Sequence, residues 1–268
     1  MDIAESVSFI EENGTDLEKA RMRHILYGAK PEPDIVQPFI ELQNADGGFP
    51  FGPAQGNPST LNNTHVALLR LDELGMLDSA TADRAFGYIL KTQRDDGGWD
   101  EDASIAGYGP PPWARPGALE ARVYLSSQSA FWLAVGGYRS HPGFHKALDF
   151  LRAHQEESGR FQGFLHSTWI ATGVFLMAGS SQYAEIARKG LEALATEPLS
   201  GWVDSQISWA LHCLGAAGLP KGNPFVEKGL TELAQRRSID GRWISEDGEG
   251  RTVGAVIETL KVLKHYEV

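Results

Sequence analysis

Apolar residues recur along this chain with helical spacing, in two patterns that alternate. The first pattern is one-sided: from residue 83 to residue 93, Phe86, Ile89 and Leu90 fall on one face of a helix. The second pattern is apolar almost all round, which predicts helices that are buried on both sides. Stretches of this second kind cover residues 64–69, 128–133, 168–173, 207–212 and 252–257.

A short phrase joins the two kinds of helix: a glutamine near the end of the one-sided helix, then glycine, then an aromatic residue. Four copies stand at residues 42–49, 90–99, 154–161 and 234–243. The loop at residues 197–202 keeps Gly201-Trp202 without the glutamine. Glycine adopts backbone conformations that end a helix. We predict that the glutamine amide and the aromatic ring tie each one-sided helix to its neighbour, through hydrogen bonds to helix ends and ring packing.

One-sided helices that alternate with doubly buried helices predict an all-α fold, an (α/α)6 barrel or toroid. The outer helices face water, and the inner helices pack between them and a central apolar cavity. Residues 5–13 and 16–28 form a degenerate first pair, so we predict six pairs, with five or seven as alternatives. Because the repeat runs nearly from end to end, we predict one domain over residues 1–268.

The composition limits the classes of partner that this chain is expected to bind. The net charge of -11 argues against nucleic acid, whose binders concentrate Lys and Arg, and against an anionic membrane surface. Cys213 is the only cysteine, so a disulfide framework is absent and a reducing cytoplasm fits. The acidic N-terminus lacks the pattern of a secretory signal, and the longest apolar run, residues 169–179, is too short to cross a bilayer. We predict a cytoplasmic protein without a transmembrane segment, cofactor or metal.

An acidic run stands near the second copy of the phrase, at residues 95–96 and 100–102. Carboxylates can hold Mg²⁺, but a short acidic run beside a turn is usually a solvated loop. We therefore interpret this run, Glu101 included, as a solvated loop outside the site.

The recurring phrase resembles the QW motif of the terpenoid cyclase and protein prenyltransferase superfamily. Two consecutive segments are similar to the C-terminal domain of squalene-hopene cyclases. In the first, Gly47-Gly48-Phe49 precedes residues 57–64, where those enzymes have Gly-Gly-Trp and then an Asp-Val-Asp-Asp-Thr phrase. In the second, residues 97–102 are similar to the family's Gly-Gly-Trp and Asp-Val-Asp phrases. Pro112-Trp113-Ala114 follows them, as the Pro-Trp-Ala phrase does in the family, and Gly117-Ala118-Leu119 lies further downstream.

The resemblance implies a ring of helices around an isoprenoid-shaped cavity. In that family, the central aspartate of the Asp-x-Asp-Asp phrase protonates an alkene or epoxide. Here Thr60-Leu61-Asn62-Asn63 stands at that place, and an amide is far too weak an acid for this step. The prenyltransferase zinc ligands are also missing, because Asp204-Ser205-Gln206 and Arg251-Thr252 stand where an aspartate, a cysteine and a histidine are expected.

If the inner helices begin at one rim, their first turns form a polar ring around the cavity. Within this ring, Asp204 and His166 are able to move protons, and Asn63, in the segment that replaces the acid phrase, is a further catalytic candidate. Asp204 is our first choice as acid or base, with a helix N-cap as the alternative. For His166 the alternative is a hydrogen-bonded barrel histidine. Arg251 offers a binding group for an anion. The polar groups predicted to contact substrate are Asn62, Gln128 and Gln206.

Aromatic side chains are frequent on three successive inner helices. They are Trp132, Trp169 and Trp209, with Tyr124 and Phe131 close by. Such rings can stabilise developing carbocations, or they can serve as ordinary core. The Gly- and Pro-rich segment from residue 100 to residue 124 is longer than the other connections and is a candidate lid over the cavity mouth.

These observations predict a terpenoid-cyclase-like enzyme that cyclises or isomerises an isoprenoid or another hydrophobic small molecule with a noncanonical acid. The alternative is a non-catalytic binding protein for a hydrophobic, isoprenoid-like ligand. A helical barrel acting on a glycan ranks last, because the inner helices carry few carboxylates beyond Asp204 and Glu258. The sequence fixes neither the substrate nor the oligomeric state.

Overall fold

A computed structural model describes residues 2–268. These residues divide into two compact units, described separately below. The middle unit comprises residues 37–194, and the terminal unit comprises residues 2–36 and 195–268. Helices α3 (Pro33–Ile40) and α9 (Ala184–Thr196) contain the two points where the chain passes between the units. Nothing in the structure tests the prediction of one domain, which stays a prediction.

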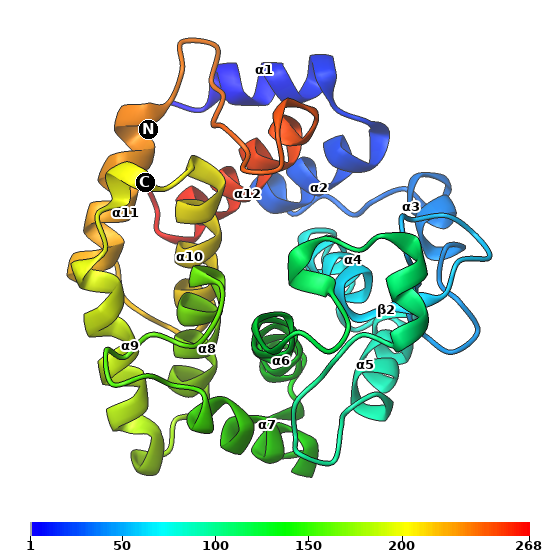
Figure 1. Cartoon of the computed structure of the whole chain (residues 1–268). Helices are drawn as coiled ribbons and strands as arrows, with labels where there is room; N and C mark the ends of the chain where they lie inside the picture. Colours follow the sequence, from blue (N-terminus) through cyan, green and yellow to red (C-terminus); the bar gives the residue numbers. More distant parts are fainter. Residues whose placement is uncertain (1) are drawn as a thin grey trace. The chain divides into compact units, whose positions relative to one another are not determined.

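The middle unit is built on three inner helices. Helix α6 (Leu119–Val135) packs against both α4 (Leu61–Glu73) and α8 (Leu165–Ala178), and Figure 1 shows it between them. The one-sided helices of this unit, apart from those crossing its boundary, are α5 (Ala80–Lys91) and α7 (Pro142–Ala153). A short antiparallel hairpin of β1 (Phe49–Pro50) and β2 (Ser59–Thr60) precedes α4. The 3-10 turns are η1 (Ala103–Tyr108), η2 (Pro112–Ala114), η3 (Tyr138–Ser140) and η4 (Ser181–Tyr183).

The terminal unit brings the two ends of the chain together around α12 (Thr252–His265). This helix packs against α10 (Asp204–Ala216), α2 (Asp16–Tyr27) and α1 (Ala4–Asn13). Helix α11 (Pro224–Arg236) packs on the outside of α10. Two 3-10 turns, η5 (Leu199–Gly201) and η6 (Glu249–Arg251), precede α10 and α12.

The helices predicted from the two apolar patterns are present, in six consecutive pairs from α1–α2 to α11–α12. Helices α6 and α8 are buried along most of their length, as predicted, because apolar or small residues cover their whole circumference. Helix α4 departs from this prediction, since Val66 is 39% exposed. In the part of the chain that the structure describes, no helix is both long and apolar enough to span a membrane.

The glutamine of the recurring phrase joins neighbouring one-sided helices, as predicted. The Gln93 amide donates to the carbonyl oxygen of Gly97 in its own loop (2.9 Å) and to that of Gly143 in the first turn of α7 (2.7 Å). Gln43 and Gln155 make the same pair of bonds, each to its own loop and to the first turn of the following one-sided helix. These side chains hold the repeat together, and no chemistry is required to explain them.

The glycine and the aromatic residue complete this connection. Gly97 has a φ of 88°, and a Cβ on it would lie 2.4 Å from the Lys146 carbonyl oxygen on α7. Only glycine allows both this backbone conformation and this close approach. The Trp99 ring donates to the Ile89 carbonyl oxygen (2.7 Å), and its backbone N–H donates to Ser126 Oγ on α6 (2.8 Å). The loop therefore joins two one-sided helices to an inner helix.

The loop that lacks the glutamine uses another donor. In the terminal unit, the Arg236 guanidinium on α11 donates to the carbonyl oxygens of Trp202 and Leu199, both at 2.6 Å. A guanidinium at the end of the following one-sided helix thus holds this loop, whereas in the other loops a glutamine at the end of the preceding helix does so.

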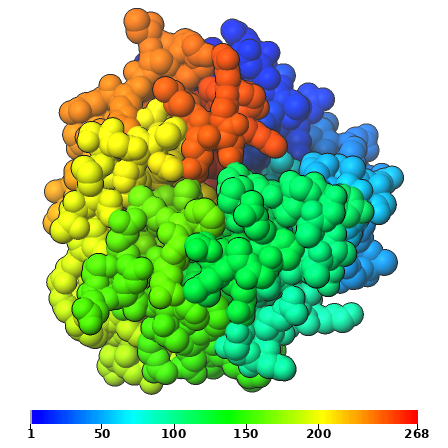
Figure 2. All heavy atoms as spheres, viewed as in Figure 1, coloured from blue at the N-terminus to red at the C-terminus, as the bar shows by residue number. Residues whose placement is uncertain are grey.

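The Gly- and Pro-rich segment ends earlier than predicted. Helix α6 begins at Leu119, so Tyr124 lies inside that helix and the connection covers residues 100–118. Figure 2 shows this segment, coloured between teal and green, on the surface of the molecule. Tyr108 and Trp113 are partly exposed on it. The role of a lid stays a prediction.

Candidate active site

A buried carboxyl group holds the start of α4, next to the place of the missing family acid. Glu101 is 1% exposed, and its two oxygens accept the backbone N–H groups of Leu61 and Asn62, both at 2.9 Å. Burial raises the pKa of Glu101 to about 7, with smaller contributions from Asp100 and Asp102 that also raise it. The two N–H bonds act in the opposite direction. The result is a carboxyl that can exchange its proton near neutral pH.

The interpretation of the acidic run as a solvated loop is therefore wrong for Glu101. Glu101 is buried within a loop that contacts of the neighbouring acids hold in place. Asp100 accepts the Gly117 N–H (3.0 Å), which closes the segment, and Asp96 pairs with Arg122 on α6 (2.6 Å). These two acids, Arg122, Arg94 and Asp95 line an open hollow of about 390 Å³. The interpretation fits Asp95 and Asp96, which are exposed.

The first turn of α4 carries the predicted residues Asn62 and Asn63. The Asn63 side-chain oxygen accepts the Thr60 hydroxyl (2.9 Å), and the Asn63 N–H donates to the same hydroxyl (3.1 Å). Asn63 thus belongs to the cap of α4. Asn62 is bound to Glu101 through its backbone N–H, so the turn that carries both residues is held by a carboxyl from another segment.

Four of the predicted site residues come together between α6 and α8. The His166 ring lies 6.3 Å from the Tyr124 ring and 4.6 Å from the Trp169 ring. The Gln128 amide donates to the Tyr124 hydroxyl (3.3 Å). His166 is partly exposed in the first turn of α8, whereas Trp169 is fully buried one turn later. This cluster of four residues places the His166 imidazole beside two aromatic rings.

Phe131 and Trp132 lie deeper in α6. Their rings contact each other at 5.3 Å, and both side chains are almost completely buried. Nearby, His65 on α4 is also buried, with its Nε2 2.9 Å from Ser129 Oγ on α6. Burial lowers the pKa of His65 to about 3, because the charged ring has no water around it. His65 therefore faces α6 as a neutral histidine.

Asp204 begins α10 in the terminal unit and is 5% exposed. One carboxylate oxygen accepts the Ile244 N–H (2.8 Å), and the other lies 3.4 Å from the Arg236 guanidinium. The alternative prediction of an N-cap is wrong, because Val203 occupies that position. Through its hydrogen bond to Ile244, Asp204 instead holds the segment after Trp243 against the start of α10.

The other predicted residues of the terminal unit are dispersed. Gln206 completes the cap of α10, since its side-chain oxygen accepts the Val203 N–H (3.0 Å), and its amide donates to Glu246 (2.7 Å). Trp209 is partly buried on α10, and Arg251 is exposed at the end of η6. Within residues 2–268, no three His, Cys, Asp or Glu side chains lie close enough to hold a metal ion together.

Comparison with solved structures identifies the fold. The type II terpene cyclase MstE from Scytonema matches with a TM-score of 0.65 at 14% sequence identity, over 98% of this chain and 96% of that one. A variant of MstE in complex with geranylgeranyl dihydroxybenzoate, described as its substrate, matches with a TM-score of 0.66. A protein from Actinoplanes matches with a TM-score of 0.65 over 99% of this chain. The predicted all-α toroid fold class is confirmed.

Sequence comparison points the same way. A squalene–hopene cyclase from Zymomonas mobilis is 26% identical over 235 residues, and one from Schizosaccharomyces japonicus is 25% identical over 238 residues. These matches cover 74% and 75% of this chain. This chain is therefore similar in sequence to squalene–hopene cyclases and similar in fold to a type II terpene cyclase. No protein-family model matches it. The matches span only 36% and 35% of the two cyclases, so this chain corresponds to about a third of their length.

The similarity to squalene–hopene cyclases draws attention to the position of Glu101. The sequence analysis missed this residue because the acidic run was judged by its local context alone. The available signal was its position directly after Gly97-Gly98-Trp99-Asp100, within the segment that is similar to a squalene-hopene cyclase phrase.

Proposed function

We propose that this chain is a terpenoid-cyclase-like enzyme that cyclises or isomerises an isoprenoid or another hydrophobic small molecule, with an acid outside the family's usual phrase. The observation that carries the proposal is the buried Glu101 carboxyl on the first turn of α4. A carboxyl whose pKa is raised to about 7 is protonated in a substantial fraction of molecules near neutral pH, and the protonated form is what a general acid needs.

Two other groups remain candidates for moving the proton. Asp204 is buried like Glu101, although its oxygens are held by Ile244 and Arg236. His166 borders the aromatic cluster, where the Tyr124 and Trp169 rings can stabilise a developing positive charge through their faces. In this proposal, Glu101 donates the proton, and the cluster and Gln128 contact the substrate.

Turnover assays on the purified full chain test the proposal. The substrates are squalene and geranylgeranyl dihydroxybenzoate, since the names of the relatives and of the MstE complex point to these two compounds. Loss of the acid is expected to lower the rate by at least about a hundredfold. We expect this loss for Glu101→Gln, and rates close to wild type for the matched control Asp102→Asn, whose exposed carboxylate accepts hydrogen bonds from Ser104 and contributes little to the pKa of Glu101.

The outcome for Asp204→Asn and His166→Phe assigns the acid. Loss of turnover in Asp204→Asn with retention in Glu101→Gln would transfer the acid to Asp204. Retention in all three variants would refute the acid mechanism. Each variant must show the wild-type circular dichroism spectrum, so that lost turnover is not confused with unfolding.

The second candidate is a non-catalytic binding protein for a hydrophobic, isoprenoid-like ligand. The observation in its favour is that Asn62 and Asn63 occupy the acid phrase. Native mass spectrometry of protein incubated with the same two compounds separates the candidates. A retained, chemically unchanged ligand without product supports binding alone, and a mass or retention-time change in the compound supports the enzyme.

A further inference from the structure

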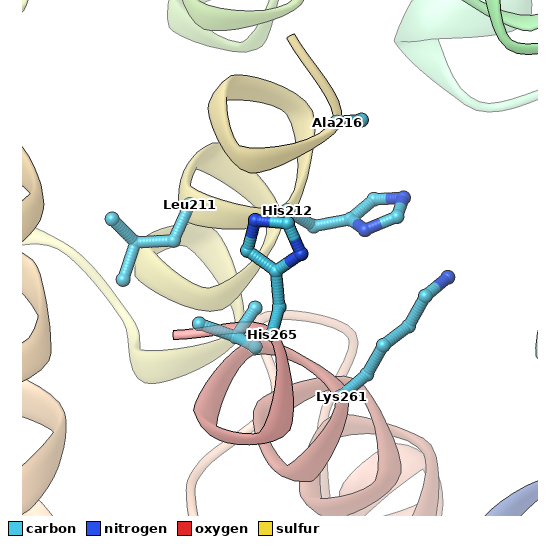
Figure 3. A pocket seen from close by; sticks show the side chains of 6 residues that line it. Leu211, His212, Ala216, Lys261 and His265 are labelled. Atoms are coloured by element: carbon cyan, nitrogen blue, oxygen red, sulfur yellow. The ribbon is translucent and has the colours of Figure 1, made fainter. Parts of the chain in front are cut away.

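A small basic cavity lies between the ends of α10 and α12, within the terminal unit. It measures about 110 Å³ and is lined by Leu211, His212, Ala216, Lys261, Val262 and His265. Three of these six side chains are basic, and none is acidic. Figure 3 shows the His212 ring, the His265 ring and the Lys261 side chain on the same side of the two helices. This grouping is unusual in a chain whose net charge is -11.

The backbone of α10 makes room for one of these rings. A Cβ on Gly215 would lie 2.9 Å from both Cδ2 and Nε2 of His265, and 3.0 Å from the Tyr266 hydroxyl. The Tyr266 hydroxyl lies 3.5 Å from the Leu211 carbonyl oxygen, and its ring contacts the His265 ring edge-on at 4.7 Å. Glycine at this position therefore seats the His265 ring against α10.

Helix polarity explains only part of the grouping. Basic residues near a helix C-terminus interact favourably with its partial negative charge, which accounts for Lys264 and His265 at the end of α12. It does not account for a second imidazole, His212, supplied by the neighbouring helix. It also does not account for a cavity between them with Leu211 and Val262 on its walls.

We propose that this cavity binds a phosphate group. Two imidazoles and an ammonium offer hydrogen-bond donors from two helices, which suits an oxyanion with several terminal oxygens. The cavity accommodates a phosphate-sized group, while a larger substituent would extend past the exposed Ala216. This site goes beyond the proposed function and does not depend on it.

Phosphate titration of the full chain tests the site. The probe is inorganic phosphate, at constant ionic strength set with chloride and at a pH of about 6. Side-chain NMR signals of His212 and His265 should shift saturably, and that of His24, on α2, should not. Lys261→Met should weaken binding by roughly tenfold or more. The matched control Lys264→Met, an exposed lysine on the same helix outside the cavity lining, should bind like wild type.

Several results would overturn the site. Absence of a saturable shift would do so, as would equal weakening in Lys261→Met and Lys264→Met, which indicates diffuse charge attraction. Gly215→Ala should abolish binding by displacing His265, and retained wild-type affinity in a folded Gly215→Ala variant would contradict the geometry. A second titration with an alkyl phosphate identifies the source. Tighter binding than inorganic phosphate supports a lipid-like phosphate ester, and equal or weaker binding supports the free anion.

Discussion

Two buried carboxyl groups lie at the start of an inner helix, one in each unit, and their partners differ. Glu101 gives both oxygens to backbone N–H groups of α4. Asp204, on α10, gives one oxygen to a backbone N–H and places the other near the Arg236 guanidinium. Backbone donors fix a carboxyl in place without supplying a full positive charge, whereas a guanidinium supplies one. One buried carboxyl is thus held by two backbone donors, whereas the other has one backbone donor and a cation beside it.

The largest effect is expected from Glu101→Ala. This change leaves the Leu61 and Asn62 N–H groups buried without their acceptor and opens a cavity, so the free energy of unfolding should fall by about 3–5 kcal/mol. Urea unfolding followed by circular dichroism measures the loss. Asp102→Ala, at an exposed carboxylate in the same loop, should cost less than about 1 kcal/mol. Similar losses for the two variants would mean that the hydrogen bonds of Glu101 to α4 do not stabilise the fold.

The next effect is a pH dependence that belongs to Glu101. Its pKa is about 7 in the folded chain, against 4.5 for an unperturbed glutamate. Between these values the folded chain keeps a proton that the unfolded chain has lost. The contribution of this proton to the free energy of unfolding is thus full below about pH 4.5. It falls as the pH rises and is lost above about pH 7, and the total loss is about 3 kcal/mol. Urea unfolding at several pH values measures this slope, and Glu101→Gln should flatten it. An unchanged slope in that variant would assign it to another group.

Asp204→Asn should have a smaller effect. The amide oxygen can still accept the Ile244 N–H, but the charge opposite Arg236 is lost, so we expect a loss of about 1–2 kcal/mol. Thermal unfolding measures the loss, and Arg236→Met in the Asp204→Asn background tests coupling. If the two changes cost the sum of their single effects, the ion pair contributes nothing to stability.

The smallest change in stability is expected from Asn63→Asp, within about 1 kcal/mol, because an acid is tolerated in the first turn of a helix. Its informative effect is on Glu101. A negative charge in the helix turn that Glu101 binds should raise the pKa of Glu101 and move the midpoint of the pH dependence upward. A midpoint that stays in place would show that the two side chains do not interact.

The repeat could be predicted from sequence because its signals are local. Helical spacing, the Gln-Gly-aromatic phrase and the loss of the glutamine at residues 197–202 are each visible within about a dozen residues. The structure adds how the loss is compensated: Arg236 reaches the carbonyl oxygens of Leu199 and Trp202 from more than thirty residues away in the chain.

The candidate site was harder to predict, since its members lie far apart in the sequence. The cluster of Tyr124, Gln128, His166 and Trp169 was predicted as a set of polar and aromatic residues, but its pairing depends on the packing of α6 against α8. Glu101 was placed among solvated acids, because nothing near it in the sequence indicates burial.

The sequence by itself determined the helical pairs, the repeat and the absence of an acid from residues 60–63. These follow from short-range periodicity and from which side chains are present. Tertiary structure decided which carboxyl group stands at the start of α4, because that contact joins residues 40 positions apart. It also decided that Glu101 is buried, and burial is what raises its pKa.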